Sequence, residues 1–98
     1  MDYQVIFSPK AVNDLEKIVR YIAINNPEAA KRIGQQLLSK AKELSKFPLR
    51  GQIVPELNDH NLRQLILKPY RIIYRVEQSN KQISIARFWH SSRESLEL

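Results

Sequence analysis

Residues 62–93 constrain the fold most, because they combine dense strand-forming residues with concentrated positive charge. Residues 70–76 and 83–89 are both rich in β-branched and aromatic side chains, and a polar segment, residues 78–81, separates them. This pattern is typical of two antiparallel strands joined by a short turn. The stretch contains seven Lys and Arg residues but a single acid, Glu77. We therefore expect a sheet that buries isoleucines on one face and displays arginines on the other.

The first part of the chain predicts a strand and a helix. Residues 3–7 form a short apolar run long enough for one strand. Ser8 and Pro9 indicate a helix start, because the hydroxyl can accept from an unpaired amide and proline fits the first helical position. The next apolar residues recur every three or four positions, as on one helix face: Val12, Leu15, Ile18, Val19 and Ile22. This helix is expected to end near Asn25.

A second helix follows at once. Asn26 is a good N-cap, Pro27 fits the first helical position, and Glu28 suits the positive end of the helix dipole. The apolar stripe of this helix is Ala30, Ile33, Leu37, Leu38, Ala41 and Leu44. Because only a few residues join the two helices, we expect an antiparallel helical hairpin with one apolar face to cover.

The remaining residues predict a connector, three strands and a tail. Residues 51–61 are rich in Gly, Pro, Asn and Asp and are interpreted as a connector. Strands are expected at residues 62–67, 70–76 and 83–89, followed by a short polar tail, residues 91–98. The order is β-α-α-β-β-β. We predict a single α+β domain, residues 1–98, with the helical hairpin packed on an antiparallel sheet.

Strand alternation predicts which side chains the helices cover. In the central strand the covered set is Ile72, Tyr74 and Val76. The opposite face then carries Arg71, Ile73 and Arg75. In the last strand, burying Ile83 and Ile85 turns the alternate residues outward: Ser84, Ala86, Phe88 and His90. The same pattern places Arg87 on the core side, and either a bulge or an emergence at the sheet edge is needed to resolve that conflict.

The composition of the chain indicates where the protein is located and what kind of partner it binds. The net charge of +6 favours an acidic or polyanionic partner, such as nucleic acid or an acidic protein. No apolar run approaches the roughly 20 residues that span a bilayer. The chain has no cysteine and enters a strand pattern directly after its first residues, so we expect no disulfide, no signal peptide and a cytoplasmic location.

An ordered set of motifs resembles a known family. These are Phe7-Ser8-Pro9-Lys10-Ala11, the helix break Asn26-Pro27, Phe47-Pro48 with Gly51, Pro69-Tyr70-Arg71-Ile72-Ile73-Tyr74-Arg75-Val76, and the ending Arg87-Phe88-Trp89-His90-Ser91-Ser92-Arg93. Their order and spacing resemble the RelE/ParE toxin superfamily over nearly the whole chain. The resemblance implies the toxin of a type II toxin–antitoxin module, also described as a plasmid stabilisation protein.

The resemblance implies partners as well. Members of the superfamily bind an acidic antitoxin whose C-terminal segment folds onto the toxin, giving a hetero-oligomer. ParE-like members inhibit DNA gyrase by binding, whereas RelE-like members cut messenger RNA on the ribosome. We favour the ParE-like branch. The alternatives are a RelE-like endoribonuclease and a non-toxic binding relative of the fold.

A nuclease would need particular residues. Metal-independent RNA cleavage requires a base, an acid and cations that hold the phosphate. By resemblance, Arg71 would hold the phosphate and His90 would carry a proton, with Glu56 or His60 as a second proton carrier. Ser91 stands where RelE-like members often have an aromatic residue, and this difference favours the ParE-like branch. No cofactor or metal is expected, since the two histidines and the scattered carboxylates form no ligand cluster in the sequence.

Six residues are candidates for partner binding: Arg63, Arg71, Arg75, Arg87, Trp89 and Arg93. Each also has a structural interpretation. The arginines can simply be hydrated side chains on an exposed face of the sheet. Trp89 can pack at the rim of the core. His90 can equally be a strand-end residue whose ring is hydrogen-bonded to the backbone.

Overall fold

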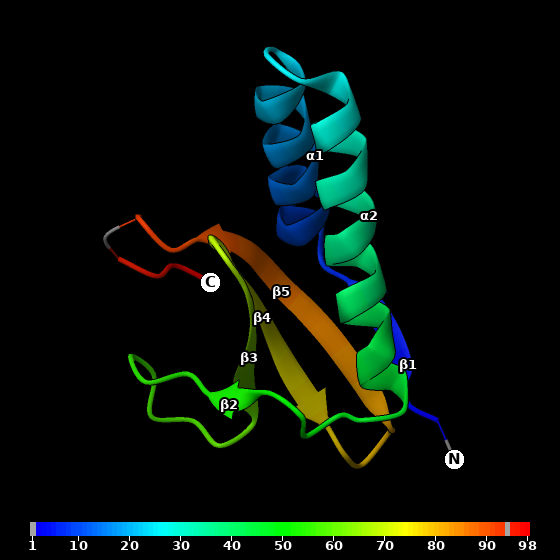
Figure 1. Ribbon diagram of the computed structural model, residues 1–98. Helices are drawn as coiled ribbons and strands as arrows, with labels where there is room; N and C mark the ends of the chain where they lie inside the picture. The colour runs from blue at the N-terminus through cyan, green and yellow to red at the C-terminus, as the bar shows by residue number, and fades with distance from the viewer. Residues whose placement is uncertain (1, 94) are drawn as a thin grey trace.

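The computed structural model describes residues 2–93 and 95–98. Helices α1 (Pro9–Ala23) and α2 (Pro27–Lys42) form an antiparallel hairpin, and a short 3₁₀ helix, η1 (Glu43–Ser45), extends α2. The hairpin packs on one face of a five-stranded sheet (Figure 1). The predicted α+β architecture is confirmed. Among the described residues, no helix has the length and apolar character needed to cross a membrane.

Both helices begin where their capping residues predicted. The Ser8 hydroxyl oxygen accepts from the amide of Ala11 at 3.0 Å, and the Asn26 side chain accepts from the amide of Ala29 at 3.0 Å. A proline follows each cap, as the first helical position prefers. These local interactions define where each helix begins.

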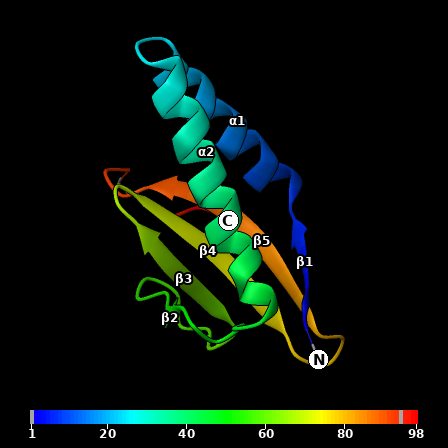
Figure 2. The ribbon, with the colours of Figure 1, turned by 45° about the vertical axis from the view of Figure 1, so that its right-hand side comes forward.

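The sheet has the strand order β1-β5-β4-β3-β2, seen from a second side in Figure 2. The strands are β1 (Gln4–Phe7), β2 (Gln52–Ile53), β3 (Leu62–Leu67), β4 (Tyr70–Glu77) and β5 (Gln82–His90). Two expectations need correction. The predicted connector contains the two-residue strand β2, and β1 pairs with β5 in parallel, so the sheet is not wholly antiparallel. A parallel neighbour is possible because the helical hairpin and the strands after it carry the chain from β1 to β5.

The main core lies between the hairpin and the sheet. Ile72, Tyr74 and Val76 of β4 and Ile83 and Ile85 of β5 are buried there, as alternation predicted. The helices supply the opposing layer, which includes Ala11, Leu37, Ala41 and Leu44. Burying these side chains removes the apolar faces of both layers from water and is the main stabilising term of the fold.

A β-bulge reverses the alternation near the end of β5. Ile73 pairs with Arg87 and Tyr74 pairs with Ile85, so Ala86 is an extra residue without a partner on β4. Residues opposite one another share a face of the sheet. The prediction that Phe88 and His90 lie beside Arg71 on one open surface is therefore wrong. Phe88 lies in the main core, stacked on Phe7, and His90 shares the helix-covered face with its β4 partner, Tyr70.

The second face of the sheet is also covered. A smaller core of Val54, Leu62, Ile73 and Trp89 lies there, with Leu57, Ala86 and Leu96 packed against it. Val54 and Leu57 come from the connector, and Leu96 comes from the tail. The open arginine face expected from the sequence is therefore largely closed by two segments that lack a periodic apolar pattern.

Candidate functional site

Arg71 lies on the second face of the sheet, and each of the three nitrogens of its guanidinium donates a hydrogen bond. Two nitrogens donate to the Glu56 carboxylate at 2.8 and 2.9 Å, and Nε donates to Gln64 at 2.7 Å. The side chain of Arg71 is 13% exposed, whereas that of Glu56 is 43% exposed. A bidentate arginine–carboxylate pair uses the same fork geometry as an arginine–phosphate pair. Glu56 thus fills the position in which Arg71 would hold a phosphate.

Arg75 forms the second ion pair on this face. It donates to Asp59 of the connector at 3.1 Å. The pKa of the Asp59 carboxyl is lowered mainly by a hydrogen bond from the Asn61 amide and next by the one from Arg75. The pKa of the Glu56 carboxyl is lowered by the hydrogen bonds from Arg71. The connector therefore places two ionised carboxylates over the two arginines of β4.

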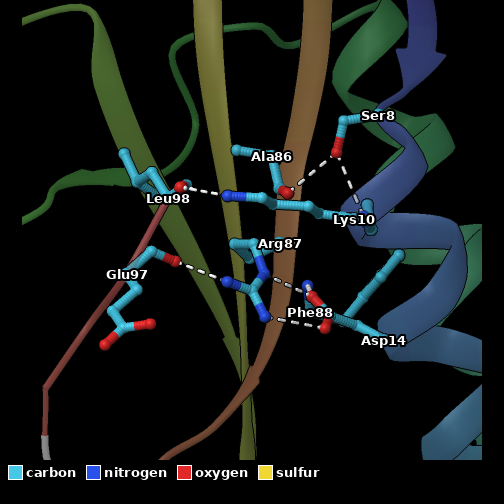
Figure 3. A network of polar contacts seen from close by, with 9 residues as sticks. Ser8, Lys10, Asp14, Ala86, Arg87, Phe88, Glu97 and Leu98 are labelled. Carbon is cyan, nitrogen blue, oxygen red and sulfur yellow. Dashed lines mark hydrogen bonds and ion pairs between the residues drawn. The ribbon is translucent and has the colours of Figure 1, made fainter.

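Arg87 lies at the edge of β5, beyond the end of β1 (Figure 3). It donates to both oxygens of Asp14 on α1, at 2.7 and 2.9 Å, and to the Glu97 carbonyl at 2.6 Å. Asp14 also accepts from the Phe88 amide at 3.1 Å, so this amide has a hydrogen-bond partner at the edge of β5 that β1 does not cover. Hydrogen bonds from Arg87 to Asp14 raise the pKa of Arg87. The bulge and the edge position together resolve the predicted conflict, and Arg87 joins α1, β5 and the tail.

Arg63 lies on the opposite face from Arg71 and Arg75, because it pairs with Tyr74. It donates to the Gly51 carbonyl at 2.9 Å. The Tyr74 hydroxyl accepts from the Gly51 amide at 2.9 Å and donates to Pro48 at 3.0 Å. Burial raises the pKa of Tyr74. Arg63 and Tyr74 thus anchor the segment after α2, where the connector begins.

Trp89 and Arg93 form a stacked pair at the end of β5. Trp89 is 1% exposed, within the second core. The Arg93 guanidinium lies 3.9 Å from the centre of a Trp89 ring, and that of Arg87 lies 4.9 Å away, both within cation–π range. Trp89 is therefore a packing residue in this structure, and Arg93 is exposed above it.

His90 lies on the other side of the sheet from Arg71. Its Nδ1 accepts from the Ser92 amide at 3.1 Å, with the Ser92 hydroxyl 2.7 Å from the same nitrogen, and its ring meets Tyr70 edge-on. The structure does not bring Arg71 and His90 together, because Arg71 pairs with Trp89 and His90 pairs with Tyr70 on the alternate face. It does bring Glu56 to Arg71. His60 is exposed on the connector.

Two residues of these networks, Asp14 and Gln64, were not predicted from the sequence. Asp14 lies on α1 and is 8% exposed. The predicted position of Arg87 on the core side was the signal that could have indicated it, because a buried arginine requires a carboxylate nearby. Gln64 lies on β3 opposite Ile73, and nothing in the local sequence marked it as a partner of Arg71. Within the described part of the chain, no group of three or more His, Asp or Glu side chains is placed to hold a metal ion.

Glu56→Gln should weaken the cover over Arg71. At neutral pH we expect a loss of up to about 1 kcal/mol of unfolding free energy, the range for exposed ion pairs. Folding lowers the pKa of Glu56, so its contribution is present above the unfolded-state pKa and is lost as pH falls through the folded-state pKa. Urea unfolding of the wild type and the variant at pH 7 and at about pH 3 should show the difference shrinking.

A matched control for this change is Glu77→Gln, in the same strand as Arg71. Glu77 accepts only from Asn80 in the described structure, so its substitution should change stability by less than about 0.5 kcal/mol at either pH. A Glu56→Gln difference that stays constant with pH would contradict the ionic origin of the effect.

Comparisons with known proteins fit this fold. A family model described as the ParE toxin of the type II toxin–antitoxin system parDE matches residues 5–95. Toxin RelE2 of Caulobacter vibrioides is 33% identical over 91 residues, covering 92% of this chain and 97% of the relative. The chromosomal ParDE system from P. aeruginosa superposes with a TM-score of 0.75 and 25% identity, covering 90% of this chain and 95% of that one.

A toxin–antitoxin complex is also similar. The RelBE2 complex from Mycobacterium tuberculosis superposes with a TM-score of 0.69 and 26% identity, covering 92% of this chain and 99% of that one. The family model spans most of the chain, and both the sequence relative and the solved structures agree with it over nearly their full lengths. The chain therefore belongs to the ParE toxin family and is the toxin of a type II toxin–antitoxin system.

Proposed function

We propose that this toxin acts in the cytoplasm by binding and inhibiting DNA gyrase, and that an acidic antitoxin neutralises it. The observation that carries the choice of a binding mechanism is the separation of Arg71 and His90 on opposite faces of the sheet. The match to the ParE family model over residues 5–95 supports gyrase as the target, as the sequence resemblance implied.

The geometry argues against cleavage by Arg71 and His90. A base and a phosphate-holding cation must lie within hydrogen-bond reach of neighbouring atoms of one substrate. Here Glu56 and Gln64 occupy the Arg71 guanidinium, and the Nδ1 of His90 is held by Ser92. A nuclease built on these two residues would need Arg71 to leave Glu56 and the two side chains to face the same side.

Cleavage of messenger RNA on the ribosome is the second candidate, and the contact between Glu56 and Arg71 is the observation that favours it. If a substrate phosphate displaced the Glu56 carboxylate from Arg71, that carboxylate would lie beside the phosphate and could act as a general base. The 33% identical relative from Caulobacter vibrioides carries the name toxin RelE2. In this alternative Glu56 would replace His90 as the proton carrier.

An acidic antitoxin fits the composition of the toxin. The net charge of +6 favours an acidic partner, and the similar structure from Mycobacterium tuberculosis is a toxin–antitoxin complex. The six residues expected to bind partners remain predictions in this role. Arg71, Arg75 and Arg87 would have to exchange an internal carboxylate for one from the partner, since each is already in an ion pair.

His90→Ala should leave killing by the toxin within about threefold of the wild type. The ring contacts Tyr70 and Ser92 and takes no part in the proposed binding mechanism, so the expected effect is that of a modest surface change. Growth inhibition after induction, compared at equal protein levels, checks this. Complete loss of killing by a variant with an unchanged melting curve would contradict the proposal.

A supercoiling assay tests the proposal with purified components. Gyrase, relaxed plasmid and the toxin are incubated together, and supercoiled and cleaved DNA are resolved on gels. We expect inhibition of supercoiling, accumulation of cleaved DNA, and relief of both when excess antitoxin is added. Undisturbed supercoiling at toxin concentrations that stop growth would reject gyrase as the target.

A further inference from the structure

Helix α2 and the segment after it, up to residue 46, carry positive charge that the chain itself does not neutralise. Residues 27–46 contain five Lys and Arg residues and two acids, Glu28 and Glu43. Among the described residues, none of these five cations forms an ion pair, whereas every arginine of β4 and β5 does. The five cations are Lys31, Arg32, Lys40, Lys42 and Lys46. The charge that is available to a partner therefore lies on the helical hairpin more than on the sheet.

Helical spacing gathers this charge on the side of α2 that faces away from the core. Lys31, Gln35 and Lys42 are separated by about one and two helical turns, so they share one face of the helix, and all three are exposed. The opposite face, which includes Leu37, lies in the main core. In Figure 2, α2 crosses in front of the sheet. We define the α2 basic face as the five cations together with the neutral donors Gln35, Gln36 and Ser39.

A shallow hollow of about 360 Å³ lies along the α2 basic face, where α2 meets the end of β3. Its lining is polar apart from Leu67 of β3, and Arg32 and Lys40 provide two cations. Glu43, the acid of the hollow, approaches Arg50 at 3.7 Å and so already has a counter-charge. Guanidinium, ammonium, amide and hydroxyl groups are all donors that bind phosphate oxygens of nucleic acids. The hollow therefore suits an anion rather than an apolar ligand.

Helix stability explains only part of this charge. Lys40 and Lys42 lie in the last turn of α2, where cations interact favourably with the helix dipole. Lys31 and Arg32 lie in the N-terminal half of the helix, where the dipole gives cations no advantage. Glu28, four residues before Arg32, forms no ion pair with it in the described structure. A contact outside the chain accounts for these two side chains better than folding does.

The chemistry of the α2 basic face favours a nucleic acid duplex over other acidic partners. Helix α2 contains no aromatic residue, and aromatic side chains are the stacking platforms for single-stranded nucleic acid and the anchors of many protein interfaces. A membrane-bound amphipathic helix needs a free apolar face, but apolar residues of α2 such as Leu37 and Ala41 lie in the core. The phosphate backbone of a duplex needs only cations and hydrogen-bond donors.

We propose that the α2 basic face binds the phosphate backbone of double-stranded DNA. Its cations pair with phosphates, and Gln35 and Ser39 donate to phosphate oxygens. An α-helix rises about 1.5 Å per residue, so Lys31 and Lys42 lie about 16 Å apart along α2. One DNA strand places a phosphate about every 3.4 Å along the duplex axis, so about four or five phosphates lie along this length. Such contacts read no bases, so no sequence preference is expected.

This contact goes beyond the proposed binding of gyrase. The toxin holds the DNA as well as the enzyme that cleaves it, through a surface that needs no internal ion pair to open. The contact also stands without gyrase, because it depends only on the charge and hydrogen-bond donors of α2. It can therefore be measured with the toxin and DNA alone.

Binding of the full-length toxin to a fluorescein-labelled DNA duplex of about 20 base pairs tests the proposal. Fluorescence anisotropy at several salt concentrations gives the affinity and its salt dependence. The logarithm of the affinity should fall linearly with the logarithm of the salt concentration, with a slope of about −0.9 per phosphate contacted. Lys31→Gln with Lys42→Gln should make this slope shallower by about 2 and weaken binding about tenfold at low salt, because two phosphate contacts are lost.

Two control pairs separate position from charge. Lys17→Gln with Lys81→Gln removes the same charge from exposed positions outside α2, so binding should stay within about threefold of the wild type. Lys31→Arg with Lys42→Arg keeps both cations on the α2 basic face and should bind like the wild type. Because every substituted side chain is exposed, the melting curves of all the variants should match that of the wild type.

The possible results decide the proposal without reference to gyrase inhibition, which has its own assay. A shallower slope for the α2 glutamine pair alone supports the α2 basic face, whichever target the toxin inhibits. Equal weakening by the two glutamine pairs would overturn the proposal, because diffuse charge would then explain the binding. Tighter binding to single-stranded DNA or to an RNA duplex of the same length would also overturn it. So would a wild-type toxin that does not bind the DNA duplex at about 50 mM salt.

Discussion

Asp14→Ala should lower the free energy of unfolding by about 3–5 kcal/mol, the usual cost of removing one partner of a buried ion pair. The side chains of Asp14 and Arg87 are 8% and 11% exposed, so the substitution leaves a guanidinium poorly solvated and without its counter-charge. It also removes the acceptor of the Phe88 amide at the free edge of β5. Because small domains are stable by only about 5–15 kcal/mol, the variant should be near the limit of folding. Urea unfolding monitored by tryptophan fluorescence measures the loss.

Two further variants separate charge from hydrogen bonding at Asp14. Asp14→Asn keeps an acceptor for the Phe88 amide and should cost less than alanine. The double variant Asp14→Ala with Arg87→Met removes both charges and should recover much of the stability, because the penalty arises mainly from the unpaired charge. A loss below about 1 kcal/mol for Asp14→Ala would show that the pair is solvated and does not join α1 to β5.

Trp89→Ala is the second large effect, at about 3–5 kcal/mol. Trp89 is 1% exposed and occupies the centre of the second core, with Val54, Leu62 and Ile73 around it. Its removal leaves a cavity under the connector and ends the stacking with Arg93. The melting temperature should fall by more than about 10 °C.

Trp89→Phe is the matched control. The indole Nε1 has no hydrogen-bond partner among the described residues, so phenylalanine sacrifices volume but no hydrogen bond. The expected cost is about 1–2 kcal/mol. Equal stability of Trp89→Ala and the wild type would contradict a packed second core, and would restore Trp89 as an exposed candidate for partner contact.

The parts of the fold that depend on interactions between residues close in the sequence were predictable. Ser8 and Asn26 cap their helices through bonds to residues three positions on, and Ile72, Tyr74 and Val76 follow a strict alternation. The bulge at Ala86 was not predictable in position, because it depends on how β5 pairs with β4. That single extra residue reversed the faces assigned to Phe88 and His90.

The candidate site was predictable in its residue types and not in its contacts. Arg71 and Arg75 do share a face, as their spacing indicated. Their partners, Glu56 and Asp59, come from a connector without apolar periodicity, so the register that brings them to β4 could not be predicted. The conflict over Arg87 was informative, since a buried arginine implied the carboxylate that α1 supplies.

Brief expression of the toxin in a sensitive bacterial host, followed by two readouts from one culture, tests whether it acts by binding gyrase. Primer extension maps cuts in cellular messenger RNA, and induction of the DNA-damage response with recovery of gyrase-linked breaks reports on gyrase. We expect DNA breaks and the DNA-damage response while the messages stay intact, and we expect co-expression of the antitoxin to suppress both the breaks and the response. Cut messages with intact DNA would contradict it and would transfer the function to cleavage at Arg71.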